Sequence, residues 1–398
     1  MKYKTIPKTQ DKISQLGFGA MRLDHNPKNL QENKEIIKYA IDNGINLIDT
    51  AYMYGNGKNE QAIGSALKEL NYRDKVKIST KMNRILINNT EDMEKMLNEQ
   101  LTYLQTDYID YYFIHNITGY KDIEKLKKLK LYEFLDDKKS QNILKNVGFS
   151  YHGSYSDFIK VVDDYDWDMS LVQYNYLDET YQAGIKGIEY LAEKGMGIFI
   201  MEPLKGGMLA GRMPQSLEDI LEIETNKSKV ELALKWILQN ENITCILSGM
   251  TDTEMLKENI NIINDETPLD EKDLEIINRI KEKITELNKV NCTGCNYCMP
   301  CPENIYIPEC FKLYNEKHLF NEKEYGVNVA TIEYVGNLMG ITGEKHDASL
   351  CTKCGKCIRK CPQHINIPRE LNQVNKGFHT RIFAPLIPIF RKLLIRII

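Results

Sequence analysis

The chain has 398 residues, of which 42% are hydrophobic and 27% are charged. This composition is typical of globular proteins and excludes a disordered or membrane-spanning chain. Lys and Arg number 52 against 56 Asp and Glu, so the net charge is -4. Because a charge-driven nucleic-acid binder carries a basic excess, we expect no nucleic-acid partner. Residues 1–7 contain no apolar stretch of signal-peptide length, which predicts a cytoplasmic protein.

Short apolar runs alternate with longer amphipathic stretches over the first two thirds of the chain, a pattern typical of repeated βα units. The expected strands are 13–21, 45–51, 76–82, 108–116, 144–151, 171–176, 197–204 and 243–250. The expected helices are 30–43, 58–70, 90–105, 122–141, 156–164, 180–194, 228–240 and 253–263. Eight units in about 250 residues predict an α/β protein with a (β/α)8 TIM barrel.

A doubly wound sheet is the alternative, but no G-x-G-x-x-G follows an early strand. Thr90 and Asp92 are the expected capping residues of the third helix, and Gly195 is the expected C-cap glycine of the sixth. Beyond the βα rhythm we identify no internal repeat.

Polar residues stand at the ends of three consecutive expected strands, where the active site of such a barrel lies. Asp49 closes the second strand with Tyr54 just beyond it, Lys81 ends the third, and His115 ends the fourth. Taken singly, each has an ordinary structural reading: a strand-end cap, a packed tyrosine, a surface lysine, a buried histidine. Together the four resemble the catalytic tetrad of the aldo/keto reductase family.

The resemblance extends over about residues 1–265. It is carried by GFGAMR (17–22), DTAYMYG (49–55), TDYIDY (106–111), VGFS (147–150) and VQYN (172–175). It implies reduction of a small-molecule aldehyde or ketone with NAD(P)H. A phenol with a pKa near ~10 is a poor acid at neutral pH unless a cation stabilises its phenolate. In the implied roles Tyr54 donates the proton, Lys81 supplies the cation, Asp49 holds Lys81, and His115 orients the substrate oxygen.

The resemblance also implies residues that hold the nicotinamide cofactor. Ser150 and Gln173 are expected at the carboxamide. The loop with Pro203, Leu204 and Gly206 is expected over the pyrophosphate, and Ser248, Glu258 and Asn259 are expected at the adenosine end. Arg22 could meet a substrate carboxylate or a cofactor phosphate, or form a structural salt bridge to Asp24 or Glu202.

Three departures from the family pattern concern this cofactor site. Tyr151 replaces the Asn that usually follows the serine, and Met201 replaces the aromatic residue that stacks on the nicotinamide in many members. No basic residue stands at the expected 2'-phosphate positions, where Gly249, Met255 and the acidic Asp252 occur instead. Since an anion site without a cation is disfavoured, we expect a weakened preference for NADP, with NAD as the alternative.

Nine of the ten cysteines fall between Cys292 and Cys361, which predicts a separate module. In a reducing compartment such spacing favours metal or cluster ligands over disulfides. Three cysteines at two-residue spacing with a fourth before a proline are typical of bacterial ferredoxins, whereas a zinc ribbon, the structural alternative, uses C-x2-C pairs. The two motifs consist of Cys292, Cys295, Cys298 and Cys301, and of Cys351, Cys354, Cys357 and Cys361.

The motifs predict two 4Fe-4S clusters. In two-cluster ferredoxins the fourth cysteine ligates the other cluster, so crossed ligation would exchange Cys301 and Cys361 between the motifs. The first motif is one residue shorter before its fourth cysteine, which leaves uncrossed ligation open. The long spacing between the motifs, with expected helices over 308–320 and 330–339, resembles helical ferredoxin domains. Cys310 and Cys245 are expected to be non-ligands.

Clusters pass single electrons, whereas the tetrad passes hydride, and the sequence shows no flavin motif that would connect the two. Three hypotheses follow. The protein is a carbonyl reductase that exchanges electrons with a ferredoxin or another redox partner; it is a reductase whose clusters are structural or sense oxygen; or its barrel is a catalytically silent docking platform for an electron-transfer protein.

We expect four segments: a barrel over 1–267, a linking helix within 268–290, a small, mainly α-helical ferredoxin-like domain over 291–375, and a basic apolar tail over 376–398. The last 28 residues carry five cations and no acidic residue. Residues 383–398 are apolar but shorter than the ~20 residues of a transmembrane helix. The tail could lie on an anionic membrane surface or pack against protein.

Overall fold

The computed structural model of the chain describes residues 1–398 apart from 24–29, 56, 212, 293, 295, 296, 321, 322, 325, 326, 342, 343, 362, 379–386 and 388–398. The side chains of 222–224, 323 and 324 are not described either. The described chain forms two compact units. The first comprises Met1–Lys205 and Val230–Leu269, and the second comprises Gly206–Lys229 and the residues from Asp270 on.

The first unit is a closed barrel of eight strands, each parallel to both neighbours. The strands are β3 (Leu16–Gly19), β4 (Leu47–Asp49), β5 (Lys77–Asn83), β6 (Ile109–Ile117), β7 (Leu144–Tyr151), β8 (Met169–Gln173), β9 (Gly197–Met201) and β10 (Cys245–Gly249). Their order around the barrel follows the chain, with β10 closing against β3. The predicted TIM barrel is therefore confirmed.

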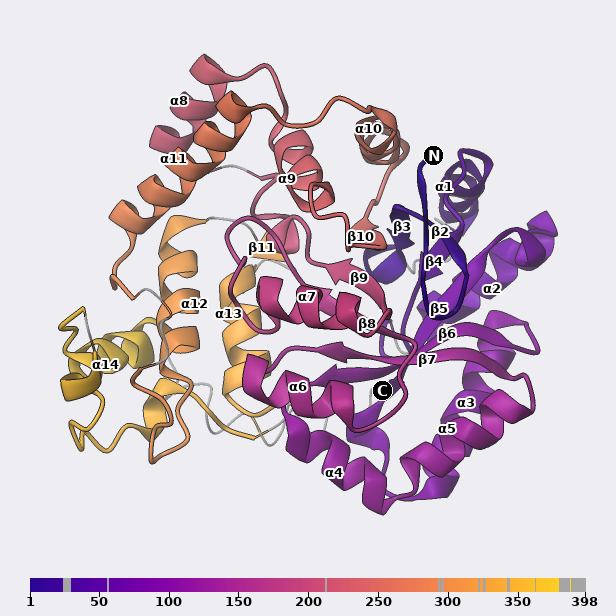
Figure 1. Cartoon of the computed structure of the whole chain (residues 1–398), viewed down its shortest axis with the longest axis horizontal. Coiled ribbons are helices and arrows are strands. Elements are labelled where there is room, and N and C mark those ends of the chain that lie inside the picture. Colours follow the sequence, from indigo (N-terminus) through magenta and orange to yellow (C-terminus); the bar gives the residue numbers. More distant parts are fainter. Residues whose placement is uncertain are drawn as a thin grey trace. The chain divides into compact units, whose positions relative to one another are not determined.

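Helices follow the strands and lie outside them (Figure 1). They are α1 (Leu30–Asp42), α2 (Lys58–Leu70), α3 (Thr90–Leu104), α4 (Tyr120–Lys128), α5 (Leu131–Ser140), α6 (Tyr155–Asp163), α7 (Gly184–Glu193), α9 (Lys229–Leu238) and α10 (Thr253–Asn264). The single helix expected over 122–141 is wrong. Lys130, in the left-handed backbone region with φ 62°, separates α4 from α5.

Of the predicted capping residues, Thr90 does not cap α3, whereas the Asp92 side chain and Gly195 lie at the predicted helix ends. The N-cap of α3 is Asn89, whose side chain accepts the Asp92 N–H at 2.9 Å. Thr90 instead donates its hydroxyl to the Leu129 carbonyl, and the Asp92 side chain accepts the Asn88 N–H. Gly195 follows α7 with φ 68°, a conformation that favours glycine, as predicted for a helix C-terminus.

The first expected strand, 13–21, is split in the structure. Lys12–Ser14 forms β2, which pairs antiparallel with β1 (Tyr3–Thr5) outside the barrel. Only Leu16–Gly19 enters the barrel. Ile13 of β2 and the neighbouring Ile6 are buried among the residues that fill the barrel lumen. The apolar Ile13, which was predicted in the first barrel strand, therefore belongs to the barrel core although its own strand lies outside the barrel.

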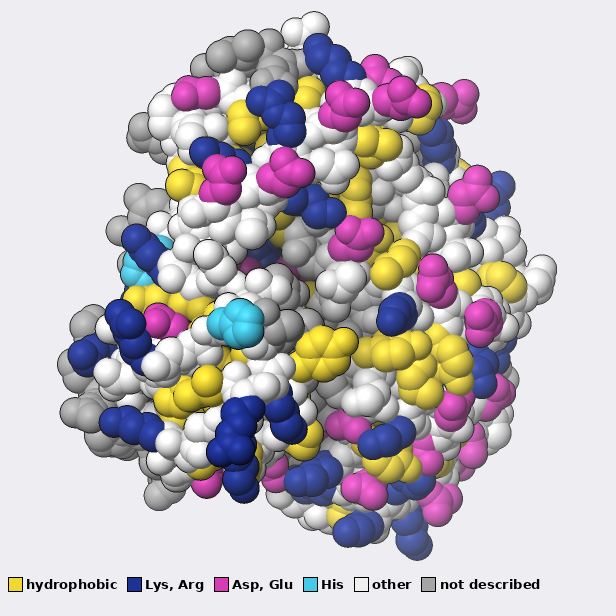
Figure 2. Space-filling view, turned by 60° about the vertical axis from the view of Figure 1, so that its left-hand side comes forward, with side chains coloured by type: hydrophobic (Ala, Val, Ile, Leu, Met, Phe, Trp, Pro, Cys, Tyr) yellow, Lys and Arg dark blue, Asp and Glu magenta, His cyan; other side chains and the backbone are white. Residues whose placement is uncertain are grey.

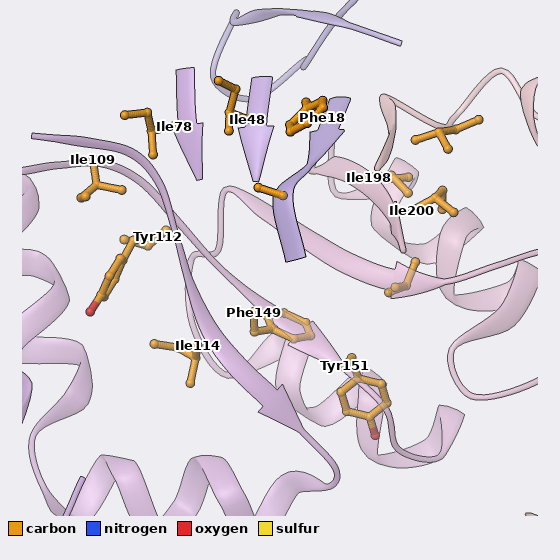
Figure 3. Packing of buried hydrophobic residues seen from close by; sticks show 14 of the residues in the cluster. Phe18, Ile48, Ile78, Ile109, Tyr112, Ile114, Phe149, Tyr151, Ile198 and Ile200 are labelled. Atoms are coloured by element: carbon orange, nitrogen blue, oxygen red, sulfur yellow. The ribbon is translucent and has the colours of Figure 1, made fainter. Parts of the chain in front are cut away.

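Strand side chains alternate between two cores, as the pleat of a strand requires. The outward set packs between strands and helices; Figure 3 shows Tyr112 and Ile114 of β6 projecting to the same side. The inward set fills the lumen and consists of Ile6, Ile13, Leu47, Tyr111, Phe113, Met169, Leu171, Phe199, Cys245 and Leu247. Because the lumen is packed, chemistry is confined to the barrel mouth.

The second unit is mainly helical, as predicted for the ferredoxin-like domain. Its helices are α8 (Gln215–Glu224), α11 (Glu271–Leu287), α12 (Ile307–Leu319), α13 (Val329–Glu333) and α14 (Ile367–Gly377). A short hairpin of β11 (Lys323–Glu324) and β12 (Val327–Asn328) precedes α13, and a π-helical turn, Tyr334–Leu338, follows it. Helix α8 was not predicted from the sequence. An Asp270 capping box starts α11.

An internal repeat that was not predicted links the two cysteine motifs to helices. Residues 301–308 and 361–368 share the pattern C-P-x-x-I-x-I-P. In both copies the residue three positions after the cysteine, Asn304 or His364, has a positive φ and donates its N–H to that cysteine's carbonyl. The prolines enter the first turns of α12 and α14, where they cost no helical hydrogen bond.

Within the described residues no helix is both long and apolar enough to cross a membrane. Nearly all of the basic apolar tail predicted after α14 lies outside the described residues.

Candidate active site and cluster sites

An ion pair between Lys81 of β5 and Asp49 of β4 lies at the mouth of the barrel. The Lys81 Nζ is 2.6 Å from the Asp49 Oδ2 and also donates to the Thr50 carbonyl at 2.7 Å. The Ser79 hydroxyl donates to the other Asp49 oxygen at 2.5 Å. Both charged side chains are buried, so each needs the partner that the other provides.

Tyr54 and His115 complete the group that the sequence predicted. The Lys81 Nζ lies 5.0 Å from the centre of the Tyr54 ring, and the two groups interact electrostatically. The rings of Tyr54 and His115 are 6.1 Å apart and meet edge to face. The structure therefore brings Asp49, Tyr54, Lys81 and His115 together from the ends of β4, β5 and β6.

The environment sets the proton state of each group. Burial acts to lower the pKa of Lys81, but its interactions with Asp49 and Tyr54 together raise that pKa above its usual value, so the ammonium keeps its proton. Burial raises the pKa of Tyr54, and Lys81 offsets only part of that effect. Burial and the nearby Lys81 hold the pKa of His115 well below its usual range. At neutral pH the site thus presents an ammonium, a protonated phenol and a neutral imidazole.

Glu202 was predicted from the sequence only as a salt-bridge partner of Arg22, but its charge also acts on Tyr54. Its charge is one of the causes that raise the pKa of Tyr54, after burial and the charge of Asp49. Glu202 follows β9 directly with φ 53°. An acidic residue before a proline at a strand end is the signal that could have drawn attention to it.

Two of the expected nicotinamide contacts lie at neighbouring strand ends. The Ser150 hydroxyl is buried and accepts the Asn116 N–H at 2.7 Å. No described residue accepts its own proton, which is therefore available to a ligand. Gln173 donates to Asp178 at 2.7 Å and accepts from Gln182 at 2.9 Å. A hydroxyl and an oriented amide fit the donors and acceptors of a carboxamide.

The adenosine-end residues are partly assembled. Asn259 of α10 donates to the Ser248 hydroxyl at 2.8 Å, and both are buried, whereas Glu258 is exposed. Pro203 is buried and Leu204 half-buried. Gly206 belongs to the second compact unit.

The structure also shows the surroundings of the residues that depart from the family pattern. Tyr151 is turned into the outer core against Phe158 and donates its hydroxyl to the Ser154 carbonyl. Met201 packs against the lumen cluster. A Cβ atom at Gly249 would lie 3.4 Å from the Cδ of Arg22, so a cationic side chain passes beside this glycine. The Asp24 partner considered for Arg22 lies outside the described residues.

In the second unit the described motif cysteines are half-buried, except Cys354, which is exposed; Cys295 lies outside the described residues. Burial and the charges of Cys351, Cys301 and Cys354 raise the pKa of the Cys357 thiol. Cys301, which belongs to the first motif, is thus among the groups that act on Cys357 of the second. The Thr352 hydroxyl donates to Glu303 at 3.3 Å, which joins the same two segments. Four thiols are the donor set of a 4Fe-4S cluster, so these residues fit one.

The chain before the first motif is fixed by α12. The Asn315 side chain both donates to the Val290 carbonyl at 2.8 Å and accepts the Val290 N–H at 2.9 Å. Cys310 of α12 is fully buried, and Cys245 is buried in the barrel lumen. Among the described residues no three His, Cys, Asp or Glu side chains are arranged around a single metal ion.

Two models of known protein families match this chain. The model of the aldo/keto reductase family matches residues 15–282, and that of a 4Fe-4S dicluster domain matches residues 291–367. The chain therefore belongs to the aldo/keto reductase family and carries a 4Fe-4S domain after its barrel. This combination confirms the resemblance found in the sequence.

Particular relatives match the barrel. L-galactose dehydrogenase of Arabidopsis thaliana is 26% identical over 318 residues, which cover 71% of this chain and 95% of that protein. A probable voltage-gated potassium channel subunit beta of the same plant is 23% identical over 315 residues, 66% of this chain and 92% of that protein.

Solved structures show the same fold. The aldo-keto reductase AKR11C1 of Bacillus halodurans, in its holo form, has a TM-score of 0.61 at 24% identity, covering 70% of this chain and 96% of that one. An aldo-keto reductase of Klebsiella pneumoniae in complex with NADPH has a TM-score of 0.56 at 19% identity, covering 71% of this chain and 96% of that one.

Proposed function

We propose that the barrel reduces an aldehyde or ketone with NAD(P)H. The observation that carries this proposal is the buried Lys81–Asp49 pair, whose ammonium lies 5.0 Å from the centre of the Tyr54 ring. A bound nicotinamide supplies the hydride. The protein must then deliver a proton to the carbonyl oxygen as negative charge develops there.

In this proposal Tyr54 is the proton donor. Its raised pKa keeps the phenol protonated at neutral pH, and the Lys81 ammonium stabilises the phenolate left after transfer. Asp49 keeps Lys81 charged in a buried site. The neutral His115 orients the substrate oxygen; among the described residues its buried Nδ1 makes no hydrogen bond, so the ring is not committed to a protein partner at that atom.

The nicotinamide carboxamide is assigned to Ser150 and Gln173. We keep the expectation of a weakened NADP preference, since Asp252 uses its carboxylate to cap α10 and Met255 is exposed without a charge. The cation beside Gly249 is Arg22, which could partly restore affinity for a phosphate. Fluorescence titration with NADH and NADPH checks this point, and much tighter NADPH binding would contradict it.

The second unit is assigned two 4Fe-4S clusters with crossed ligation. The hydrogen bond from Thr352 to Glu303, two residues after Cys301, supports one of them, and the repeated C-P-x-x-I-x-I-P backbone supports an equivalent second. Bound clusters supply one-electron transfer. A cysteine donor set with one exposed member, Cys354, favours electron exchange over a purely structural role.

Deuterium transfer tests the reductase chemistry directly. The anaerobic holoprotein is incubated with a panel of aldehydes and ketones and with NADH or NADPH deuterated at C4 of the nicotinamide. Reduction by this site places deuterium on the former carbonyl carbon, which NMR detects. Alcohol product without deuterium, after both faces of C4 have been labelled, would contradict hydride transfer.

A further inference from the structure

The second cysteine motif carries a group of cations that the reductase chemistry does not use. Lys353, Lys356, Arg359 and Lys360 stand between the cysteines of residues 351–361, and all four are exposed. Among the described residues none of them is paired with a carboxylate; the nearby Glu303 instead accepts a hydrogen bond from Thr352. Figure 2 shows Lys and Arg side chains gathering at the lower left of one face of the molecule.

The first motif lacks such charges although it shares the cysteine spacing. Residues 292–301 contain no charged side chain. If the cations only balanced the thiolates of a bound cluster, both motifs would need them equally. The difference therefore indicates a task specific to the surface around the second motif.

The backbone at Lys353 supports the same reading. Lys353 has φ 59°, in the left-handed region that favours glycine, and the equivalent residue of the first motif is Gly294 with φ 67°. A glycine would fit this turn with less strain than the lysine does. The position thus carries a charged side chain at a conformational cost.

The same surface has the features of an electron entry point. The Cys354 ligand is exposed, and Ile358 is 39% exposed between the cations. An apolar contact within a charged rim is the usual composition of a transient protein interface. Clustered exposed charges also steer an oppositely charged partner to its site.

We propose that the surface formed by Lys353, Lys356, Ile358, Arg359 and Lys360 docks a small acidic one-electron carrier protein of the ferredoxin type. The reduced carrier passes one electron to the cluster held by the second motif; the carrier is oxidised, the cluster is reduced, and no bond or proton changes. The inference rests on the proposed cluster ligation but not on carbonyl reduction.

Stopped-flow mixing tests this proposal with a plant-type [2Fe-2S] ferredoxin, reduced beforehand, as the probe. The anaerobic holoprotein is compared with Lys353→Gly/Lys360→Gln. Gly suits the backbone at 353, and Gln keeps most of the side chain at 360. The control is Lys272→Gln, at an exposed lysine of α11. Iron content and reduction by methyl viologen radical verify that each variant holds reducible clusters.

At about 10 mM ionic strength, the double variant should lose about tenfold or more of the second-order rate constant. The rates should converge near 1 M salt, and the control should match the unmodified protein. An equal rate in the double variant, or an equal loss in the control, overturns the proposal. A second outcome would also overturn the proposal. If the unmodified protein bound phosphatidylserine vesicles, and the double variant lost this binding but kept the unmodified rate with ferredoxin, the surface would bind a membrane and not a carrier protein.

Carbonyl reduction separates the two proposals. Neither Lys353 nor Lys360 lies in the barrel, so the double variant should reduce carbonyl compounds with NAD(P)H at the unmodified rate. If the unmodified protein reduces no carbonyl compound but shows the predicted salt and charge dependence with ferredoxin, the proposed reductase function fails and the docking surface stands.

Discussion

The ammonium of Lys81 and the carboxylate of Asp49 form an ion pair of 2.6 Å in which the side chains are only 1% and 7% exposed. Such a pair is weak evidence for stability, because desolvation of both charges opposes their attraction. Its value lies in holding a charged ammonium beside the Tyr54 phenol.

Replacing Lys81 by Met should therefore cost both stability and activity. The variant leaves the Asp49 carboxylate buried without its cation, which should lower the free energy of unfolding by about 3–5 kcal/mol. It should also lower kcat about 10²-fold or more. Adding Asp49→Asn should restore stability but not turnover, as urea unfolding and steady-state kinetics would show. Recovery of turnover in the double variant would contradict the role of Lys81.

Glu202 provides a test of the pH dependence. Its charge contributes to the raised pKa of Tyr54, so Glu202→Gln should lower that pKa. Because the reaction needs the protonated phenol, the fall of kcat/KM on the basic side should move to lower pH. The control is Glu254→Gln, at a carboxylate that is 85% exposed and pairs with Lys257. A shift to higher pH, or the same shift in the control, would contradict the assignment.

Glu60 of α2 should make barrel stability depend on pH. Burial raises its pKa to about 7 from 4.5, although Thr80 and Gln100 donate to the Oε1. The folded state therefore keeps the proton to higher pH than the unfolded state, and stability falls as pH rises from 4.5 through 7. The difference in pKa corresponds to about 3 kcal/mol.

Glu60→Gln removes this ionisation, so its urea midpoint should exceed that of the unmodified protein at pH 8 and approach it near pH 5. Trp167 and Trp236, both in the first unit, make tryptophan fluorescence a report on the barrel. Glu69→Gln, at an exposed position of the same helix, should leave the pH profile unchanged. Parallel profiles for Glu60→Gln and the unmodified protein would refute the prediction.

Iron analysis of double variants tests the crossed ligation. The unmodified protein should hold about eight irons per chain. With crossed ligation, Cys301→Ala/Cys351→Ala removes two ligands of one cluster and leaves about four irons, whereas Cys301→Ala/Cys292→Ala disables both clusters. Uncrossed ligation predicts the reverse pattern. Cys310→Ala, in the core of the second unit, should keep all the iron.

The sequence was sufficient to predict the barrel because its strands and helices have distinct periodicities, and the positions of Asp49, Lys81 and His115 followed from strand ends. It did not predict the break at Lys130, because a non-glycine residue with positive φ leaves no mark in the hydrophobic pattern. The β1–β2 hairpin was missed because Ile13 alternates like a barrel residue. The effect of Glu202 on Tyr54 depends on packing across the barrel mouth, which local sequence does not encode.

The central claim is that Tyr54 donates the proton in a nicotinamide-dependent carbonyl reduction. The measurement is anaerobic NAD(P)H oxidation with the best substrate of an aldehyde and ketone panel, for the unmodified protein, Tyr54→Phe and Tyr52→Phe. Tyr52 lies on the same loop but donates its hydroxyl to Glu99 at 2.6 Å, so it serves as the matched control. Tyr54→Phe should lose about 10²–10⁴-fold of kcat, and Tyr52→Phe should stay near the unmodified rate. Equal rates for all three proteins would contradict the account and favour a barrel that serves only as a docking platform.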